Sequence, residues 1–165
     1  MSPALQELAR SVPQADEVVR VALRMMAALI IGTVIGLQRE LSHKPAGLRT
    51  HLLVALGTAL LVVAAVNAGM QSADVSRVIQ GLITGIGFLG GGTILKLTQE
   101  HEIRGLTTAA GIWLTAAASV AAGLGKFADA FIGVFFALIV LTAVGKLDGH
   151  LRDRNERESS DRHRL

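Results

Sequence analysis

Arginine, threonine and glycine recur together at two places in the chain, where they could bind an anion. The first place contains Arg39, Glu40, Arg49 and Thr50, and the second contains Arg104, Thr107 and Thr108. Thr50 and Thr108 each end a Gly-Leu-x-Thr segment near the expected start of a helix, where unpaired backbone N–H groups and the helix dipole favour negative charge. These segments predict two sites for a phosphate or carboxylate group. The simpler alternative is that the same residues are ordinary loop cations with threonine helix caps.

Residues suited to metal binding or catalysis are not grouped in this sequence. The five histidines lack the i,i+4 spacing of a helical metal pair, and no serine has a plausible base beside it. The chain contains no cysteine, which excludes thiolate ligands and cysteine nucleophiles. We therefore predict no catalytic residue, no metal site and no cofactor.

A glycine-rich segment, Gly85-Ile-Gly87-Phe-Leu-Gly90, matches the letters of the dinucleotide-binding pattern G-x-G-x-x-G. That motif requires a preceding strand and a helix that opens at the glycines, whereas these glycines lie inside an apolar run. Small residues four positions apart instead let helices approach closely in a membrane. The glycines expected to pack in this way, within the chain or across a dimer, are Gly32, Gly36, Gly81, Gly85, Gly87, Gly90 and Gly91.

The elements that would position these residues are five apolar runs. They cover residues 21–37, 52–68, 78–95, 106–124 and 127–144, and their only charged residues are Arg24 and Asp129. About 20 apolar residues in a helix span the hydrocarbon core of a bilayer, and the chain as a whole is 51% hydrophobic with a mean hydropathy of +0.50. A soluble bundle would need a polar stripe at helical spacing, which the run 52–68 lacks. The sequence predicts an all-α membrane protein, a bundle of about five transmembrane helices with short loops.

Polar segments flank the apolar runs and predict the orientation. We expect an N-terminal polar segment at residues 1–20, a transmembrane domain at 21–145 and a charged cytoplasmic tail at 146–165. Eleven of the sixteen Lys and Arg residues fall on the side of the tail. Because positively charged loops stay in the cytoplasm, the N-terminus is predicted outside and the C-terminus inside. Acidic residues nearly balance the charge of the tail, so no nucleic-acid partner is expected.

Four motifs occur in order along the apolar part of the chain. They are Gly36-Leu-Gln-Arg39-Glu40, Pro45-Ala-Gly47-Leu-Arg49-Thr50-His51, Gly85-Ile-Gly87-Phe-Leu-Gly90 and Arg104-Gly-Leu-Thr107-Thr108-Ala-Ala. Together they resemble the MgtC/SapB family, and the resemblance covers roughly residues 21–144. It implies a bacterial cytoplasmic (inner) membrane protein of a family linked to growth in low magnesium and, in some pathogens, to survival inside macrophages. The virulence members are described as acting on the ATP synthase.

The sequence departs from the family pattern in two respects. Family members commonly have an acidic residue at the position of Gln38. A role that depends on that carboxylate is therefore not expected in this chain. Longer members also carry a C-terminal ACT-like domain, and this sequence resembles the short form without it. Regulation through such a domain is therefore not expected in this chain.

Two classes of function fit these observations. The first is a non-enzymatic regulator that contacts another membrane complex, and the resemblance points to the ATP synthase as that complex. The chain could also form a homodimer. The second is a small transporter or a lipid- or anion-binding protein in which Arg39, Arg49, Arg104 and Thr108 hold an anionic headgroup or solute. Magnesium permeation is the weaker alternative, because Mg²⁺ prefers carboxylate ligands and no acidic residue occupies the middle of an apolar run.

Overall fold

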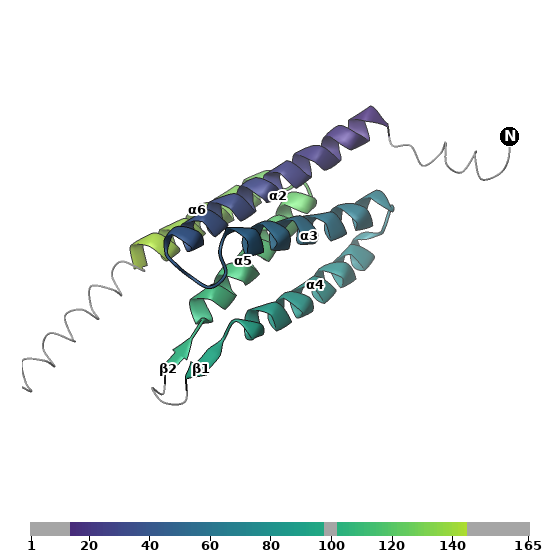
Figure 1. The fold of residues 1–165 in the computed structure, drawn as a ribbon. Coiled ribbons are helices and arrows are strands. Elements are labelled where there is room, and N and C mark those ends of the chain that lie inside the picture. The colour runs from purple at the N-terminus through teal and green to yellow at the C-terminus, as the bar shows by residue number, and fades with distance from the viewer. Residues whose placement is uncertain (1–13, 98–101, 145–165) are drawn as a thin grey trace, which may run out of the picture.

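The structure is a computed structural model that describes residues 14–97 and 102–144. Five α-helices make up most of these residues: α2 (Ala15–Leu41), α3 (Leu48–Asn67), α4 (Ser72–Gly92), α5 (Leu106–Gly123) and α6 (Phe127–Ile139). A π-helical turn, η1 (Val140–Val144), continues α6. The helices form an elongated bundle (Figure 1). The predicted all-α membrane bundle of about five helices is confirmed.

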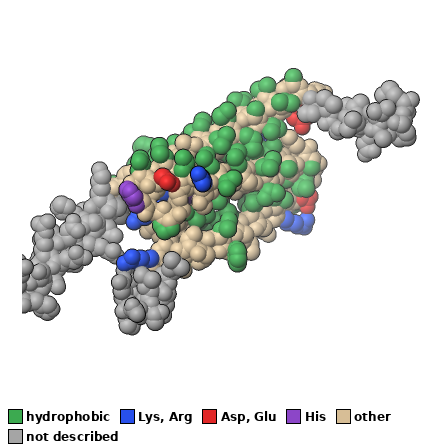
Figure 2. All heavy atoms as spheres, viewed as in Figure 1, with side chains coloured by type: hydrophobic (Ala, Val, Ile, Leu, Met, Phe, Trp, Pro, Cys, Tyr) green, Lys and Arg blue, Asp and Glu red, His purple; other side chains and the backbone are tan. Residues whose placement is uncertain are grey.

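The length and composition of the helices suit a bilayer. Helices α2, α3 and α5 are each long and apolar enough to cross a membrane, and Phe127–Ala143 is a shorter apolar helix. Figure 2 shows charged side chains gathered toward the two ends of the visible face, with hydrophobic side chains over the surface between them. The chain is a multi-pass membrane protein. Residues 1–13 of the predicted N-terminal polar segment (1–20) lie outside the described residues, as does the whole predicted tail (146–165), and helix α2 already begins at Ala15.

The third helix differs from the apolar run 78–95 at both ends. Helix α4 begins earlier, at Ser72, where the Asp74 carboxylate accepts a 2.7 Å hydrogen bond from Arg77. It ends at Gly92, since three consecutive glycines favour helix formation weakly. Leu95–Leu97 instead forms strand β1, which pairs antiparallel with β2 (Glu102–Arg104) in a small hairpin that the sequence analysis did not predict.

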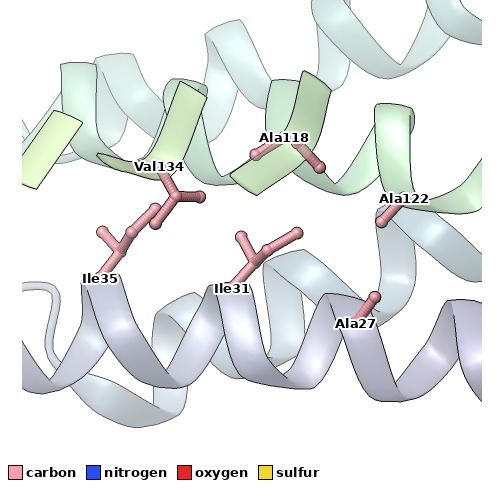
Figure 3. Packing of buried hydrophobic residues seen from close by; sticks show 7 residues of the cluster. Ala27, Ile31, Ile35, Ala118, Ala122 and Val134 are labelled. Atoms are coloured by element: carbon pink, nitrogen blue, oxygen red, sulfur yellow. The ribbon is translucent and has the colours of Figure 1, made fainter. Parts of the chain in front are cut away.

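Helix α5 lies at the centre of the bundle and contacts α2, α3, α4 and α6. Small and branched apolar side chains pack where α2, α5 and α6 meet. The buried members of this cluster are Ala27, Ile31, Ile35, Ala118, Ala122, Ala130 and Val134 (Figure 3). Because lipid tails are as apolar as these side chains, close van der Waals packing and interhelical hydrogen bonds hold such helices together. The same close packing brings polar residues of three helices into contact near one end of the bundle.

Candidate functional site

The end of α2 meets the start of α5 through a buried arginine. Arg39 lies in the last turn of α2, and only 2% of its surface is exposed. Its Nη2 donates a 3.1 Å hydrogen bond to Oγ1 of Thr108, which is equally buried in the first turn of α5. The structure therefore joins one predicted residue from each of the two basic segments in a single contact.

A histidine from α3 lies in the same region. His51 is fully buried, and its Nδ1 is 2.7 Å from Oγ1 of Thr115 on α5. The Thr115 hydroxyl donates its one hydrogen to the backbone oxygen of Gly111, at 2.9 Å. With the hydroxyl hydrogen on Gly111, the hydroxyl accepts from His51; in that tautomer Nδ1 carries the proton and Nε2 is an acceptor in the neutral ring.

Gly111 of α5 lies between the arginine and the histidine. A Cβ atom added to Gly111 would stand 3.6 Å from Cε1 of His51 and 3.9 Å from Nε of Arg39. Both Nε of Arg39 and Nε2 of His51 are buried without a hydrogen-bond partner among the described residues. We call Arg39, His51, Thr108, Gly111 and Thr115 the buried polar cluster. Within the described chain, no group accepts a hydrogen bond from Nε of Arg39 and donates one to Nε2 of His51.

The charge of Arg39 has no counter-charge in the described part of the chain. Two exposed ion pairs lie in this part of the chain, Arg20 with Asp16 and Arg77 with Asp74, and neither involves Arg39. Burial of an unpaired cation is costly because the charge loses its hydration. The arrangement is therefore suited to binding an anion, and it opposes binding of a cation.

Glu40, next in sequence to Arg39, has a different role. Its Oε2 accepts a 2.9 Å hydrogen bond from the backbone N–H of Leu48, the first residue of α3. The carboxylate lies directly against Gly47, so that a Cβ at Gly47 would overlap it. Glu40 thus supplies the anion at the start of α3.

The remaining predicted anion-site residues lie on the surface. Arg49 and Thr50 are exposed in the first turn of α3, and the structure does not bring them to Arg39. Arg104 and Thr107 are exposed beside the start of α5. Helix α5 begins after Gly105, whose φ of +96° favours glycine, and it has no side-chain cap. The N-cap residues of α3 and α5 are Gly47 and Gly105, so neither Thr50 nor Thr108 caps its helix.

The predicted packing glycines divide into two groups. Gly32 and Gly36 lie against α3, where an added Cβ would come within 2.9 Å of the backbone oxygen of His51 and of Cα of Leu48, respectively. Gly90 lies near Ala109, whose Cβ is 3.5 Å from the added atom. For Gly81, Gly85, Gly87 and Gly91, no such neighbour lies within 4 Å. Close packing of these four with a second molecule stays a prediction.

Two of the open glycines belong to a polar stripe on α4. Gln80, Thr84, Gly87 and Gly91 are exposed, and their spacing of four, three and four residues places them on one side of the helix. We call these four residues the outer face of α4. The Thr84 hydroxyl donates to the backbone oxygen of Gln80 at 3.0 Å, within the same helix. Gly81 and Gly85 line a different surface, an apolar groove of about 570 Å³ between α3 and α4.

Metal ligands are not gathered in the described ranges 14–97 and 102–144. They contain no group of three or more His, Asp or Glu side chains that could hold a metal ion. The arrangement that does occur there is a guanidinium without a counter-charge, beside an imidazole and the start of a helix, and it suits an oxyanion.

Comparison with known proteins gives a consistent family. A family model described as "MgtC family" matches residues 25–150. The chain is 40% identical over 146 residues to Protein SrpB of Synechococcus elongatus, covering 82% of this chain and 80% of that protein. It is 36% identical over 140 residues to the Putative magnesium transporter YhiD of Escherichia coli, covering 81% of this chain and 64% of that protein.

A further relative is Protein MgtC of Salmonella typhimurium, 36% identical over 116 residues, with 70% of this chain and 48% of that protein covered. The chain spans about half the length of several other curated relatives that it matches. No solved structure matches the chain.

Proposed function

The chain belongs to the MgtC family, and on that premise we propose that it is a non-enzymatic regulator in the bacterial inner membrane. It acts by contact between α4 and a helix of another membrane complex. By family resemblance, this complex is the ATP synthase, and the regulation serves adaptation to low magnesium and virulence. The C-terminal end of the chain lies in the cytoplasm.

The observation that carries this proposal is the outer face of α4. A glutamine side chain that faces lipid is unfavourable, because its amide finds no hydrogen-bond partner there. In the described residues, the side chain of Gln80 makes no hydrogen bond, while Gly87 and Gly91 leave the helix backbone accessible. A partner helix packed on this face could approach the glycines closely and bond to Gln80.

The position of α4 supports the same conclusion. Among the described elements its main contacts are with α5 and α3, and much of its surface has no neighbour among them. Phe88, beside Gly87, is 84% exposed. A helix at the edge of the bundle can gain a partner without disturbing the packing of the central helices.

Magnesium permeation has less support, although one relative is named a putative magnesium transporter. A Mg²⁺ pathway normally uses carboxylate oxygens. Of the described carboxylates whose exposure is known, Asp16, Glu40 and Asp129 are exposed and Glu17 and Asp74 are partly exposed. Among the residues of known exposure, the buried charged group is Arg39, which repels a divalent cation.

Co-purification from gently solubilised membranes tests the proposal. The wild-type chain is expected to recover subunits of the ATP synthase, whereas Gly87→Leu and Gln80→Leu should reduce the recovery at least fivefold. Gly133→Leu on α6 is the matched control, because Gly133 also has no neighbour within 4 Å of an added Cβ. Equal recovery with the α4 variants, or recovery of a second copy of the chain alone, would contradict the proposed contact.

A further inference from the structure

We propose that Arg39 and the first turn of α5 form a binding site for a phosphate group that carries an ionisable P–OH. The phosphate is either inorganic phosphate or the headgroup of a phosphomonoester lipid such as phosphatidic acid. This inference does not depend on the regulatory contact through α4, since it concerns ligand binding by the isolated protein at other helices.

The first step of the argument is the unpaired charge. Arg39 is 2% exposed, and the one hydrogen-bond partner of its guanidinium in the described chain is the neutral hydroxyl of Thr108. A water molecule could satisfy the free Nε–H, but it would not neutralise the guanidinium. A phosphate does both, and guanidinium groups bind phosphate oxygens in a fixed geometry.

The second step is a comparison of two similar helix starts. Helix α3 begins within Gly47-Leu-Arg-Thr50, and helix α5 begins within Gly105-Leu-Thr-Thr108. At α3, the carboxylate of Glu40 accepts from the backbone N–H of Leu48. Leu106 occupies the equivalent position in α5, whose N-cap residue, Gly105, has no side chain that could cap the helix. The first helix start thus contains an internal anion, and the second has the buried Arg39 beside it instead.

The third step identifies the protonation state of the ligand. Nε of Arg39 is a donor, and Nε2 of His51 is an acceptor in the tautomer that carries its proton on Nδ1; both atoms are unpartnered near Gly111 in the described chain. A phosphate monoanion can accept from the arginine and donate its P–OH to the histidine. A carboxylate has no hydrogen to donate, and neither does the phosphodiester of phosphatidylglycerol. The pair therefore favours inorganic phosphate or a phosphomonoester.

The surroundings of Arg39 allow the phosphate to come either from solution or from a lipid headgroup. Arg104, Leu106 and Thr107 are exposed at the start of α5, where a free ion could enter. Thr107 and Gly111 also line an apolar groove of about 320 Å³ between α5 and α6, with Phe136 and Val140 on the opposite wall. This groove could hold an acyl chain whose headgroup lies beside Arg39.

Binding measurements on purified, delipidated protein test the proposal. Inorganic phosphate is titrated by calorimetry, and nanodiscs containing phosphatidic acid, phosphatidylglycerol or neither are compared for retained lipid by mass spectrometry. Saturable binding of inorganic phosphate assigns the free ion, and selective retention of phosphatidic acid assigns the lipid. Absence of both, or equal retention of phosphatidylglycerol, would overturn the proposal.

Variants then locate the site. Arg39→Gln is expected to weaken phosphate binding at least tenfold. Gly111→Ala places a methyl group between Arg39 and His51 at ordinary contact distances, and alanine favours a helix, so this variant should fold while also weakening binding. Arg49→Gln removes an exposed arginine from the start of α3 and is the matched control. Equal binding by all three variants would show a nonspecific ion effect and reject the site.

Discussion

The carboxylate of Glu40 bonds to the backbone N–H of Leu48, and so the last turn of α2 directly holds the first turn of α3. The loop between them is short, and Gly47 lies against the carboxylate within it. One side chain therefore fixes the angle at which the chain returns into the bundle. Its neighbour Arg39 points inward from the same helical turn.

Glu40→Gln is expected to lower the free energy of unfolding by about 1 kcal/mol, because a neutral amide replaces the charge at the helix start. Gly47→Val should cost more, since its side chain displaces the carboxylate. Unfolding in mixed detergent micelles, followed by circular dichroism, measures both effects. Ser42→Ala, in the same loop, is the control, and equal stability of all four proteins would contradict the role of Glu40.

Gly36→Leu is expected to destabilise the bundle by about 1–3 kcal/mol through overpacking of α2 against α3. The new side chain would meet the backbone at Leu48, which cannot move aside as a side-chain end can. Gly87→Leu, which meets no atom of the described chain within 4 Å of its Cβ, should leave the melting temperature of the purified protein within about 2 °C of wild type. Comparable melting temperatures for the two variants would contradict this distinction.

Thr115→Val is expected to cost about 1–3 kcal/mol, because it leaves the buried Nδ1–H of His51 without an acceptor. Thr33→Val is the matched control. The Thr33 hydroxyl donates to the backbone oxygen of Leu29 in its own helix and is exposed, so its loss should have little effect. Thermal unfolding in detergent compares the two variants, and a similar loss in both would refute the structural role of the His51 bond.

The predicted orientation can be tested with single cysteines, since the chain has none of its own. Ser72→Cys at the start of α4 should react with a membrane-impermeant maleimide added to intact spheroplasts. Ser42→Cys, in the loop between α2 and α3, should react only after the membrane is opened. The reverse pattern would place the N-terminus in the cytoplasm.

The helices were predictable from the sequence because nearly all charge lies between or beyond the apolar runs. The exact ends of the helices were harder to predict, because polar residues continue two helices beyond the apolar runs. These residues are Gln38–Leu41 at the end of α2 and Ser72–Arg77 at the start of α4. The hairpin of β1 and β2 was missed because its short strands adjoin an apolar run.

The candidate site was predicted in part. Arg39 and Thr108 were selected from their residue types, and the exposed residues Arg49 and Thr50 were selected by the same criterion. Residue type does not indicate which side chains face inward. The position of each residue around its helix does distinguish the buried side chains from the exposed ones. Arg39 lies three residues after Gly36 and seven after Gly32, on the side that packs against α3.

His51 was missed because a single histidine carries no spacing signal. Its neighbours on the same side of α3, Ala55 and Thr58, are buried as well. That periodicity could have indicated an inward-facing polar group. The contact with Thr115 itself depends on how α3 and α5 pack, which local sequence does not determine.

The central place of α5 has a consequence for how this protein can vary. Nearly all buried residues of α5 are glycine, alanine, serine or threonine, and the exception is Ile112. The small side chains of α5 therefore set the distance between the helices that pack on its opposite sides. A wider side chain on its buried surface would push several helices apart at once, so tolerated substitutions should accumulate on the lipid-facing flanks of α6 and α2 and be sparse along α5.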